Sequence, residues 1–444
     1  MQVTSTLDTV VIGGGFSGLF LATQLARLDR DVLLLEASPR PGGVAATVIE
    51  DGFVLEPAAG TFMLPHRSLT PLLDSAGVAV EEAYPDAALR YVWMRDSLVA
   101  IHYGPKALAT SALSKRGKLR MAAEPFIRSS PPDEGVEESL REFLTRRLGR
   151  EAGTLLSHIA ASGVYAGDPN NMSAAAAFPL FTELEAEAGS IVRGGIRRVR
   201  ALPKPRPPKP KSHIPVGGMS EAAVTLAASL GERYRSEHPV TSVTKEGDYF
   251  RIEGAETLHA RSVVIALRPD AASTILQDID TTVLHGWPSS RVVVVGVGGA
   301  AQDVPLPSGF GFLTGPDTDA VTLGCLFESS YAPGRAAPGR SLAKVIAGGA
   351  RNPGFVDRSD EQIVEAVVSE MERALRATIT PSWTKVLRDA AGIPQYDLHH
   401  RRRLAAVDDL EAANPGLIFA GWAYRGIGVA HLATDALRVV DRIP

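Results

Sequence analysis

One short segment near the amino terminus constrains the fold of this chain more than any other. Four β-forming residues, Thr9 to Ile12, run directly into the spacing Gly13-x-Gly15-x-x-Gly18, and a helical pattern follows as far as Leu28. Gly13 permits a tight turn, Gly15 lets the backbone approach a pyrophosphate, and Gly18 lets the helix pack closely on the strand. Free N–H groups at the start of the helix then face the phosphates. The segment therefore predicts a dinucleotide site.

The chain continues with the other parts that such a site requires. A second apolar strand is predicted at Val32–Leu35, and it ends at Glu36. A carboxylate at that position can bind both hydroxyls of a ribose. A glycine motif alone could be an ordinary loop, but here strand, helix, second strand and terminal acid follow in the required order.

The residues after Glu36 favour one particular cofactor. The segment Glu36–Gly43 has the form E-x-x-x-R-x-G-G, which resembles the FAD-binding signature of the flavin amine oxidase superfamily. Arg40 would add positive charge near the pyrophosphate, and Gly42 and Gly43 would let the chain pass close to the ligand. The resemblance implies FAD. The alternative is a proline-glycine turn that carries a surface arginine.

Later stretches of the chain are assigned to the same domain. Glu237–Val243 fits a strand whose Val240 backbone would meet the adenine, and Val263–Ala266 fits a strand that closes the sheet. Leu417–Gly428 predicts a buried strand and a glycine turn, with a helix following from about 429 to 441. That helix N-terminus would stabilise the negative charge of reduced flavin. The predicted cofactor residues of this last stretch are Trp422, Gly426, Gly428 and Val429. Read alone, the stretch could equally be a glycine-capped strand–helix joint.

Length and composition exclude several other classes of protein. The 444 residues suffice for two or three domains, and 45% hydrophobic with 22% charged residues is typical of a globular protein. The net charge of −4 carries no signal for nucleic acid binding. Cys325 is the only cysteine, so an internal disulfide is excluded and a thiolate metal cluster is not expected. No metal site is predicted.

We predict an α/β FAD-binding, Rossmann-like domain that carries the GxGxxG motif, with a β-rich substrate domain and a helical lobe. The FAD-binding domain is predicted to be discontinuous, over 1–88, 215–285 and 385–444. The substrate-binding domain is assigned to 89–102 and 286–384, and the helical lobe to 103–214. Within that lobe, the apolar spacing from Val136 to Leu148 predicts a helix over 135–148. The Pro-, Lys- and Arg-rich segment 202–211 is expected to be an exposed loop.

A more specific resemblance lies in blocks spread along the chain. Gly163-Val-Tyr-Ala-Gly-Asp-Pro169, followed by Met172-Ser173, resembles a signature of the protoporphyrinogen oxidases. Further blocks similar to that family are 178–194, 307–313, 348–353 and 392–396, the last with His400 and Arg403. They occur in family order over nearly the whole chain.

The resemblance implies an enzyme that oxidises a porphyrinogen to a porphyrin in haem biosynthesis. FAD would accept a hydride from a meso carbon while a pyrrole N–H loses its proton. O2 would then reoxidise the flavin and yield hydrogen peroxide, although another electron acceptor is not excluded. This chemistry requires neither a metal nor a catalytic triad, because the flavin performs the redox step. No residue is therefore singled out as catalytic.

Three residues are assigned to the substrate through the same resemblance. Arg90 lies on the family strand that carries an arginine for a propionate, a group that guanidinium binds with two hydrogen bonds. Gly163 corresponds to the glycine whose carbonyl faces the macrocycle, and Ile346 to an apolar residue against a pyrrole. Without the resemblance, Arg90 would be a surface residue on a strand edge and Ile346 a core residue.

Several departures from the family pattern widen the range of functions that the sequence allows. The family's Gly-Pro pair is Ala58-Ala59, the bulky Trp422 stands where a small amide is usual, and Ala430-His431-Leu432 replaces Asn/Asp-Cys-Ile. Protoporphyrinogen IX is the first choice of substrate and coproporphyrinogen III the close variant. Two more distant functions also fit the sequence: a flavin oxidoreductase for an amine, carotenoid or specialised metabolite, and a flavin- or porphyrin-binding protein with little catalysis.

The expected location is the cytoplasm, with a peripheral contact on the inner face of the cell membrane left open. No secretory signal or transmembrane helix is predicted. The basic stretch Ser114–Arg120 would suit a membrane surface or a solvated helix end equally well. The sequence does not give the oligomeric state.

Overall fold

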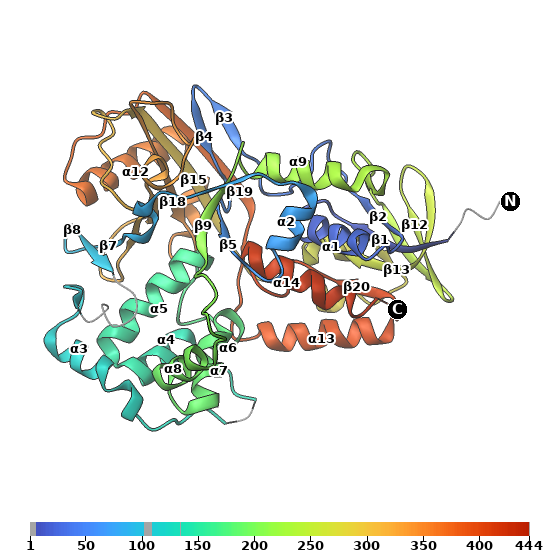
Figure 1. Ribbon diagram of the computed structural model, residues 1–444, viewed down its shortest axis with the longest axis horizontal. Coiled ribbons are helices and arrows are strands. Elements are labelled where there is room, and N and C mark those ends of the chain that lie inside the picture. Colours follow the sequence, from blue (N-terminus) through green and yellow to red (C-terminus); the bar gives the residue numbers. More distant parts are fainter. Residues whose placement is uncertain (1–5, 102–108, 134, 444) are drawn as a thin grey trace.

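The structure is a computed structural model that describes residues 6–101, 109–133 and 135–443. Figure 1 shows one sheet near the two termini, a second sheet at the far end of the long axis, and a cluster of helices below the second sheet. The chain passes between the two sheets several times.

The larger sheet holds the segment with the glycine motif. Its eight strands have the order β10-β2-β1-β13-β12-β11-β14, and β20 also pairs with β13. The central strand β1 is parallel to β2 and β13, and Val11 is in register with Leu34 and Val264. The strands of this sheet are β1 (Leu7–Ile12), β2 (Val32–Leu35), β10 (Tyr234–Arg235), β11 (Ser242–Glu246), β12 (Tyr249–Glu253), β13 (Thr257–Ile265), β14 (Leu276–Gln277) and β20 (Leu417–Phe419).

Helices cover both faces of this sheet, which explains the uninterrupted apolar runs of its central strands. On one face, a single core cluster joins the inward side chains of β1, β2, β13 and β20 to four helices. These helices are α1 (Phe16–Arg27), α2 (Thr70–Ala76), α9 (Met219–Leu230) and α14 (Val429–Val440). The other face packs against α10 (Pro269–Ile275) and α13 (His400–Ala413).

The second sheet has seven strands in the order β19-β15-β18-β17-β16-β7-β8. Its strands are β7 (Arg90–Met94), β8 (Ser97–Ile101), β15 (Ser289–Ala300), β16 (Gly311–Thr314), β17 (Thr322–Leu326), β18 (Arg340–Gly348) and β19 (Trp383–Pro394). One face is covered by α12 (Asp360–Leu375), which buries Val295, Val345 and Cys325. The opposite face meets the hairpin of β3 (Val48–Glu50) and β4 (Phe53–Leu55).

The helical lobe differs in detail from the sequence prediction. The helix predicted over 135–148 is α4 (Leu140–Leu148), because Ser139 and Glu142 form a capping box that starts it at Leu140. Val136 therefore lies outside the helix and is exposed. The other helices of the lobe are α3 (Lys115–Ala122), α5 (Arg150–Tyr165), α6 (Ala174–Ala177), α7 (Pro179–Ala188), α8 (Ile191–Ala201) and the short 3-10 helix η3 (Glu124–Phe126). Within the described part of the chain, none of the helices is both long and apolar enough to span a membrane.

Two of the predicted domain boundaries fall inside strands. The boundary at 384/385 cuts β19, which pairs with β15 from Trp383 to Pro394 and so extends the second sheet. The boundary at 214/215 cuts β9 (Lys211–Pro215), which joins β5 (Phe62–Leu64) and β6 (Val80–Glu82) in a small sheet. We place these boundaries after Pro394 and before Lys211. Residues 202–210 form the predicted exposed loop, and the strand starts at Lys211.

Candidate functional site

The glycine motif forms a tight turn at the carboxyl end of β1. Gly13 has a φ of +110°, in the region that L residues with a side chain rarely adopt. A Cβ on Gly18 would lie 2.0 Å from the carbonyl oxygen of Gly13, so only glycine lets α1 pack this closely on the turn. Both glycines have the structural roles that the spacing predicts.

Gly15 and the segment after β2 lie side by side, with Gly15 bridged to Gly42. The Gly42 N–H donates to the Gly14 carbonyl at 2.8 Å, and a Cβ on Gly15 would meet nothing nearer than the Gly43 Cα at 4.0 Å. Gly15 is also the N-cap of α1, which has neither a side-chain cap nor an acidic residue in its first turn. The free N–H groups of α1 therefore point into a cradle that fits a pyrophosphate.

Glu36 is held at the edge of this cradle. Its Oε2 accepts a hydrogen bond from the Gly14 N–H at 2.6 Å, and its Oε1 accepts from the Ser38 backbone N–H and hydroxyl at 2.8 and 2.7 Å. These bonds fix the carboxylate beside the glycine turn and leave Oε2 with acceptor capacity for a ribose hydroxyl.

Arg40 is exposed and lies over the segment that follows it. Its guanidinium donates to the carbonyl oxygens of Ala45 and Gly43 at 3.4 and 3.3 Å. The structure thus shows Arg40 bracing the loop at Gly42 and Gly43. A direct contribution of its charge to phosphate binding stays a prediction.

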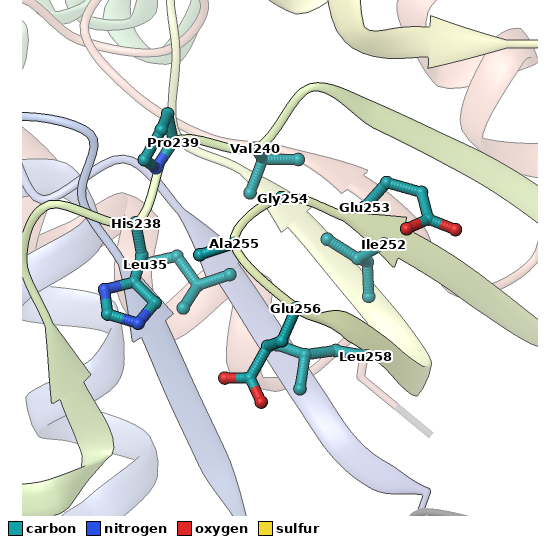
Figure 2. A pocket seen from close by; sticks show the side chains of 10 residues that line it. All are labelled: Leu35, His238, Pro239, Val240, Ile252, Glu253, Gly254, Ala255, Glu256 and Leu258. Atoms are coloured by element: carbon teal, nitrogen blue, oxygen red, sulfur yellow. The ribbon is translucent and has the colours of Figure 1, made fainter.

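Val240 lies in a loop, and the strand predicted over Glu237–Val243 is wrong in its extent. Glu237 has a positive φ of 57°, which interrupts an extended strand, and β11 starts only at Ser242. Figure 2 shows a pocket in which Val240, His238 and Pro239 lie opposite the turn after Ile252, with Leu35 of β2 beside them. Because Leu35 immediately precedes Glu36, this pocket is at the ribose end of the cradle. Its occupation by adenine stays a prediction.

The carboxyl-terminal turn faces the same edge of the sheet. β20 ends at Phe419, two strands from β1, and α14 begins at Val429 with Gly428 as its N-cap. The Gly421 N–H donates to Asp435 Oδ2 at 3.1 Å, which ties the start of the turn to α14. Gly426 has a φ of +88° and packs against His431. Because β1, β2 and β20 are parallel, their carboxyl ends meet at one edge, where α/β sheets bind ligands.

Two aromatic residues brace this turn from outside. The Tyr396 hydroxyl donates to the Trp422 carbonyl at 2.6 Å, and His400 Nε2 donates to the Tyr424 carbonyl at 2.9 Å. The two rings stack at 3.8 Å between centroids. Burial lowers the pKa of His400 to about 4, so the imidazole is neutral and can keep this donor role. Both residues belong to the block at 392–403 that the sequence singled out.

Trp422 is half-buried and packs on the core that contains α1 and α14. The Arg268 guanidinium lies 6.0 Å from its ring centroid. The structure therefore gives this bulky residue an apolar support, and a contact between Trp422 and the cofactor stays a prediction.

The substrate side can be traced across the second sheet, because residues in register on neighbouring strands share a face. On the face opposite α12, one cross-strand row is Val92, Leu313, Gly324, Ile346, Val294 and Leu387. The next row on that face is Arg90, Gly311, Leu326, Lys344, Gly296 and Lys385. The structure thus brings Arg90 and Ile346 to one face, three strands apart.

Gly163 lies above this face. A Cβ on Gly163 would lie 2.8 Å from Leu313 Cδ1, so α5 approaches the sheet closely there. α5 covers Val92 at one end of the row, and the β3–β4 hairpin covers Val294 at the other. Leu313 beside α5, Ile346 beside the hairpin cluster and Leu326 in the next row are each only half-buried. The three predicted substrate residues therefore lie around partly exposed apolar side chains, and their contact with a substrate stays a prediction.

The structure contains a cluster of buried charged residues that was not predicted from the sequence. Lys344, in the row of Arg90, is 3% exposed and lies among Glu328, Arg335 and Glu56, which are equally buried. The only signal in the sequence is a lysine inside the apolar strand Leu342–Ile346.

The sheet built from separate segments, the glycine cradle and the turn before α14 define the class of this protein as a dinucleotide-binding α/β protein. Residues 16–443 match the family model described as flavin-containing amine oxidoreductase. The chain belongs to that family, and FAD is its cofactor. Gly15 is partly exposed and Gly43 is exposed, as the close approach of this cofactor to the backbone requires.

Individual relatives extend over most of the chain. The chloroplastic protoporphyrinogen oxidase of Oryza sativa subsp. japonica is 31% identical over 97% of this chain and 85% of its own length. The coproporphyrinogen III oxidase of Bacillus subtilis (strain 168) is 26% identical over 95% of this chain and 94% of its own. A crystal structure provisionally assigned as a protoporphyrinogen oxidase, from Exiguobacterium sp. 255-15, is 24% identical, has a TM-score of 0.80 and matches over 99% of both chains. The family predicted from the sequence and the fold class are confirmed.

Proposed function

We propose that this protein oxidises a porphyrinogen, with protoporphyrinogen IX as the preferred substrate, to the porphyrin of haem biosynthesis. The observation that carries the proposal is the partly uncovered apolar face with Ile346 in one row and Arg90 in the next. An apolar macrocycle with carboxylates at its rim matches such a surface, because its rings gain from burial and its propionates need a cation. The similarity to protoporphyrinogen and coproporphyrinogen oxidases supports the same substrate class.

In this proposal the residues of the chain bind and orient, and bound FAD supplies the acceptor for the hydride. Arg90 holds a propionate, while Leu313 and Ile346 pack against pyrrole rings. α5 and the β3–β4 hairpin close the two ends of the face and exclude water from the macrocycle. Orientation of a reacting carbon in this way lowers the entropic part of the barrier.

The choice between the two porphyrinogens rests on the cations of the substrate face. Arg90 is half-buried there, and its guanidinium lies over the Phe310 ring. One guanidinium suits protoporphyrinogen, which has two propionates, better than coproporphyrinogen, which has four. Coproporphyrinogen III is the second candidate, favoured by the similarity to the Bacillus subtilis enzyme.

We also propose O2 as the electron acceptor, with hydrogen peroxide as its product. A turnover assay under air tests both statements. The FAD-loaded protein should produce porphyrin fluorescence and hydrogen peroxide together, at rates proportional to its concentration. Porphyrin formation no faster than with the apoprotein would reject the proposed activity. Porphyrin formation without peroxide would reject O2 alone.

For the helical lobe we propose a peripheral contact with an anionic membrane through α8. Val192, Ile196 and Val199 are exposed, 47% in the case of Ile196, and their spacing places them on one helix face. Phe126 of η3, which packs beside α8, is 89% exposed. The polar positions of α8 carry arginines, and further Lys and Arg residues follow in the exposed loop 202–210. An apolar stripe with flanking cations is typical of a helix that lies in a membrane surface.

A cytoplasmic location stays a prediction.

A further inference from the structure

Four charged side chains form a buried cluster between the two sheets. Arg335 Nη1 donates to Glu56 Oε1 at 2.8 Å, and Arg335 Nε lies 3.5 Å from Glu328 Oε2. Glu328 Oε1 in turn lies 3.4 Å from Lys344 Nζ. None of the four residues is more than 3% exposed. Two carboxylates and two cations make the cluster neutral as a whole.

Such a cluster is an unusual way to hold a fold together. Removing four charges from water is costly, and well-packed apolar residues often stabilise a core as well or better. Burial and the neighbouring Glu328 carboxylate raise the pKa of Tyr331, so Glu328 lies against this buried phenol as well as against its two cations. The part of the backbone that the cluster holds in place therefore indicates its role.

The cluster positions the loop 56–60, which connects β4 to β5. Lys344 Nζ donates to the Ala58 carbonyl at 3.0 Å, and Arg335 Nη2 donates to the Gly60 carbonyl at 2.9 Å. Both cations come from the second sheet or the segment before it, so this loop is fixed to the substrate side.

The same cluster reaches the nucleotide side through Glu56. Its Oε1 also accepts from the Met219 N–H at 3.0 Å, at the start of α9, and its Oε2 accepts from the Thr47 hydroxyl at 2.9 Å. Thr47 follows the Gly42–Gly43 wall of the cradle and exchanges hydrogen bonds with Ser220. A continuous set of contacts thus runs from the cradle to Lys344, which lies two residues before Ile346 on the same face.

We propose that Lys344, with Glu328 as its counter-ion, is a positioning residue for the flavin. By holding the Ala58 carbonyl, it sets the loop 56–60 as a wall between the pyrophosphate cradle and the substrate face, where the flavin ring must lie. The inference depends on FAD binding and not on the identity of the substrate, so a failure of the porphyrinogen proposal leaves its test valid.

A double substitution separates this role from a purely structural one. Lys344→Met alone leaves an uncompensated buried carboxylate and is expected to lower the melting temperature strongly. Lys344→Met with Glu328→Gln keeps the cluster neutral and is expected to restore most of that loss. The double variant still lacks the bond to Ala58, so its Kd for FAD, from titration of the apoprotein, should rise about 10-fold. Lys385→Met, in the same row but at the surface, is the matched control and should bind FAD normally.

Hydrogen–deuterium exchange of residues 56–62, measured on ice, provides a second readout for a variant of low stability. Exchange in this loop should be faster in the double variant, while exchange in α12 should be unchanged. Wild-type FAD affinity together with wild-type exchange in the double variant would overturn the proposal. Faster exchange in α12 as well would also overturn it, since the cluster would then stabilise the whole domain.

Discussion

Arg90 begins β7 at the edge of the substrate face, and its guanidinium lies over the Phe310 ring at 4.4 Å. The aromatic ring supports the flat side of the guanidinium, and hydrogen bonds form along its edge. This geometry suits a carboxylate that approaches from the face of the sheet. Arg90 is therefore the residue on which substrate affinity depends most in the proposed function.

Arg90→Ala is expected to raise KM more than it lowers kcat, because the propionate lies far from the reacting carbon. Arg90→Lys keeps the charge but not the paired hydrogen bonds, and should give an intermediate KM. Steady-state kinetics with protoporphyrinogen IX check both variants. An unchanged KM in Arg90→Ala would remove the anchoring role.

Residues fixed by local geometry could be predicted from the sequence, and residues fixed by distant contacts could not. Gly13, Gly18 and Glu36 belong to one strand–helix–strand unit, so their spacing alone predicts the turn, the helix packing and the place of Glu36 beside the turn. Lys344 and Glu328 meet through the tertiary structure and have no motif. The predicted strand at Val240 was wrong because Glu237 has a positive φ, and a pattern of β-forming residues does not reveal that backbone conformation.

At the scale of elements, the turn between β20 and α14 is held by groups that must stay neutral. His400 donates to the Tyr424 carbonyl and has no hydrogen-bond partner at Nδ1 among the described residues. His158 of α5 is similarly buried, with Nε2 3.1 Å from the Thr314 carbonyl, and its pKa is also lowered to about 4 by burial. Both imidazoles make protonation of the folded state unfavourable.

A pH dependence of stability follows from these two histidines. Between the ordinary pKa of 6.5 and the folded value of about 4, only the unfolded chain binds the protons, so stability falls as the pH falls through this range. Each histidine contributes a slope of about 1.4 kcal/mol per pH unit, and the loss levels off below the folded pKa.

Urea unfolding at several pH values measures this slope. His400→Asn should be less stable at neutral pH but lose less stability on acidification. His285→Asn, at an exposed position, is the control and should keep the wild-type slope. Equal slopes for His400→Asn and the wild type would contradict the account of the buried imidazole.

The exposed stripe of α8 predicts a lipid dependence. Ile196→Asp with Val199→Asp should reduce sedimentation with phosphatidylglycerol vesicles several-fold, while FAD content stays unchanged because α8 lies outside the cradle. Vesicles of phosphatidylcholine alone should bind the wild type weakly. Equal binding of variant and wild type to the anionic vesicles would exclude α8 as the contact.

At the level of the whole molecule, the proposed function requires two sheets, and successive segments of the chain contribute to one sheet and then to the other. The order of segments could be predicted because nucleotide strands and substrate strands differ in their motifs. The boundaries could not, since β19 and β9 mix polar and apolar residues, continue through the predicted limits without a break, and are assigned to their sheets only by strand pairing. Arg90 and Ile346 were predicted as separate residues, and only the register of the strands shows that they lie on one face, three strands apart.

The central claim is that the bound flavin takes electrons directly from a porphyrinogen. Anaerobic mixing of the FAD-loaded protein with protoporphyrinogen IX in a stopped-flow spectrometer tests it most directly. The visible flavin absorption should bleach while porphyrin absorption grows, faster than with coproporphyrinogen III. A flavin that stays oxidised with both porphyrinogens, yet is reduced by dithionite, would exclude direct electron transfer from a porphyrinogen.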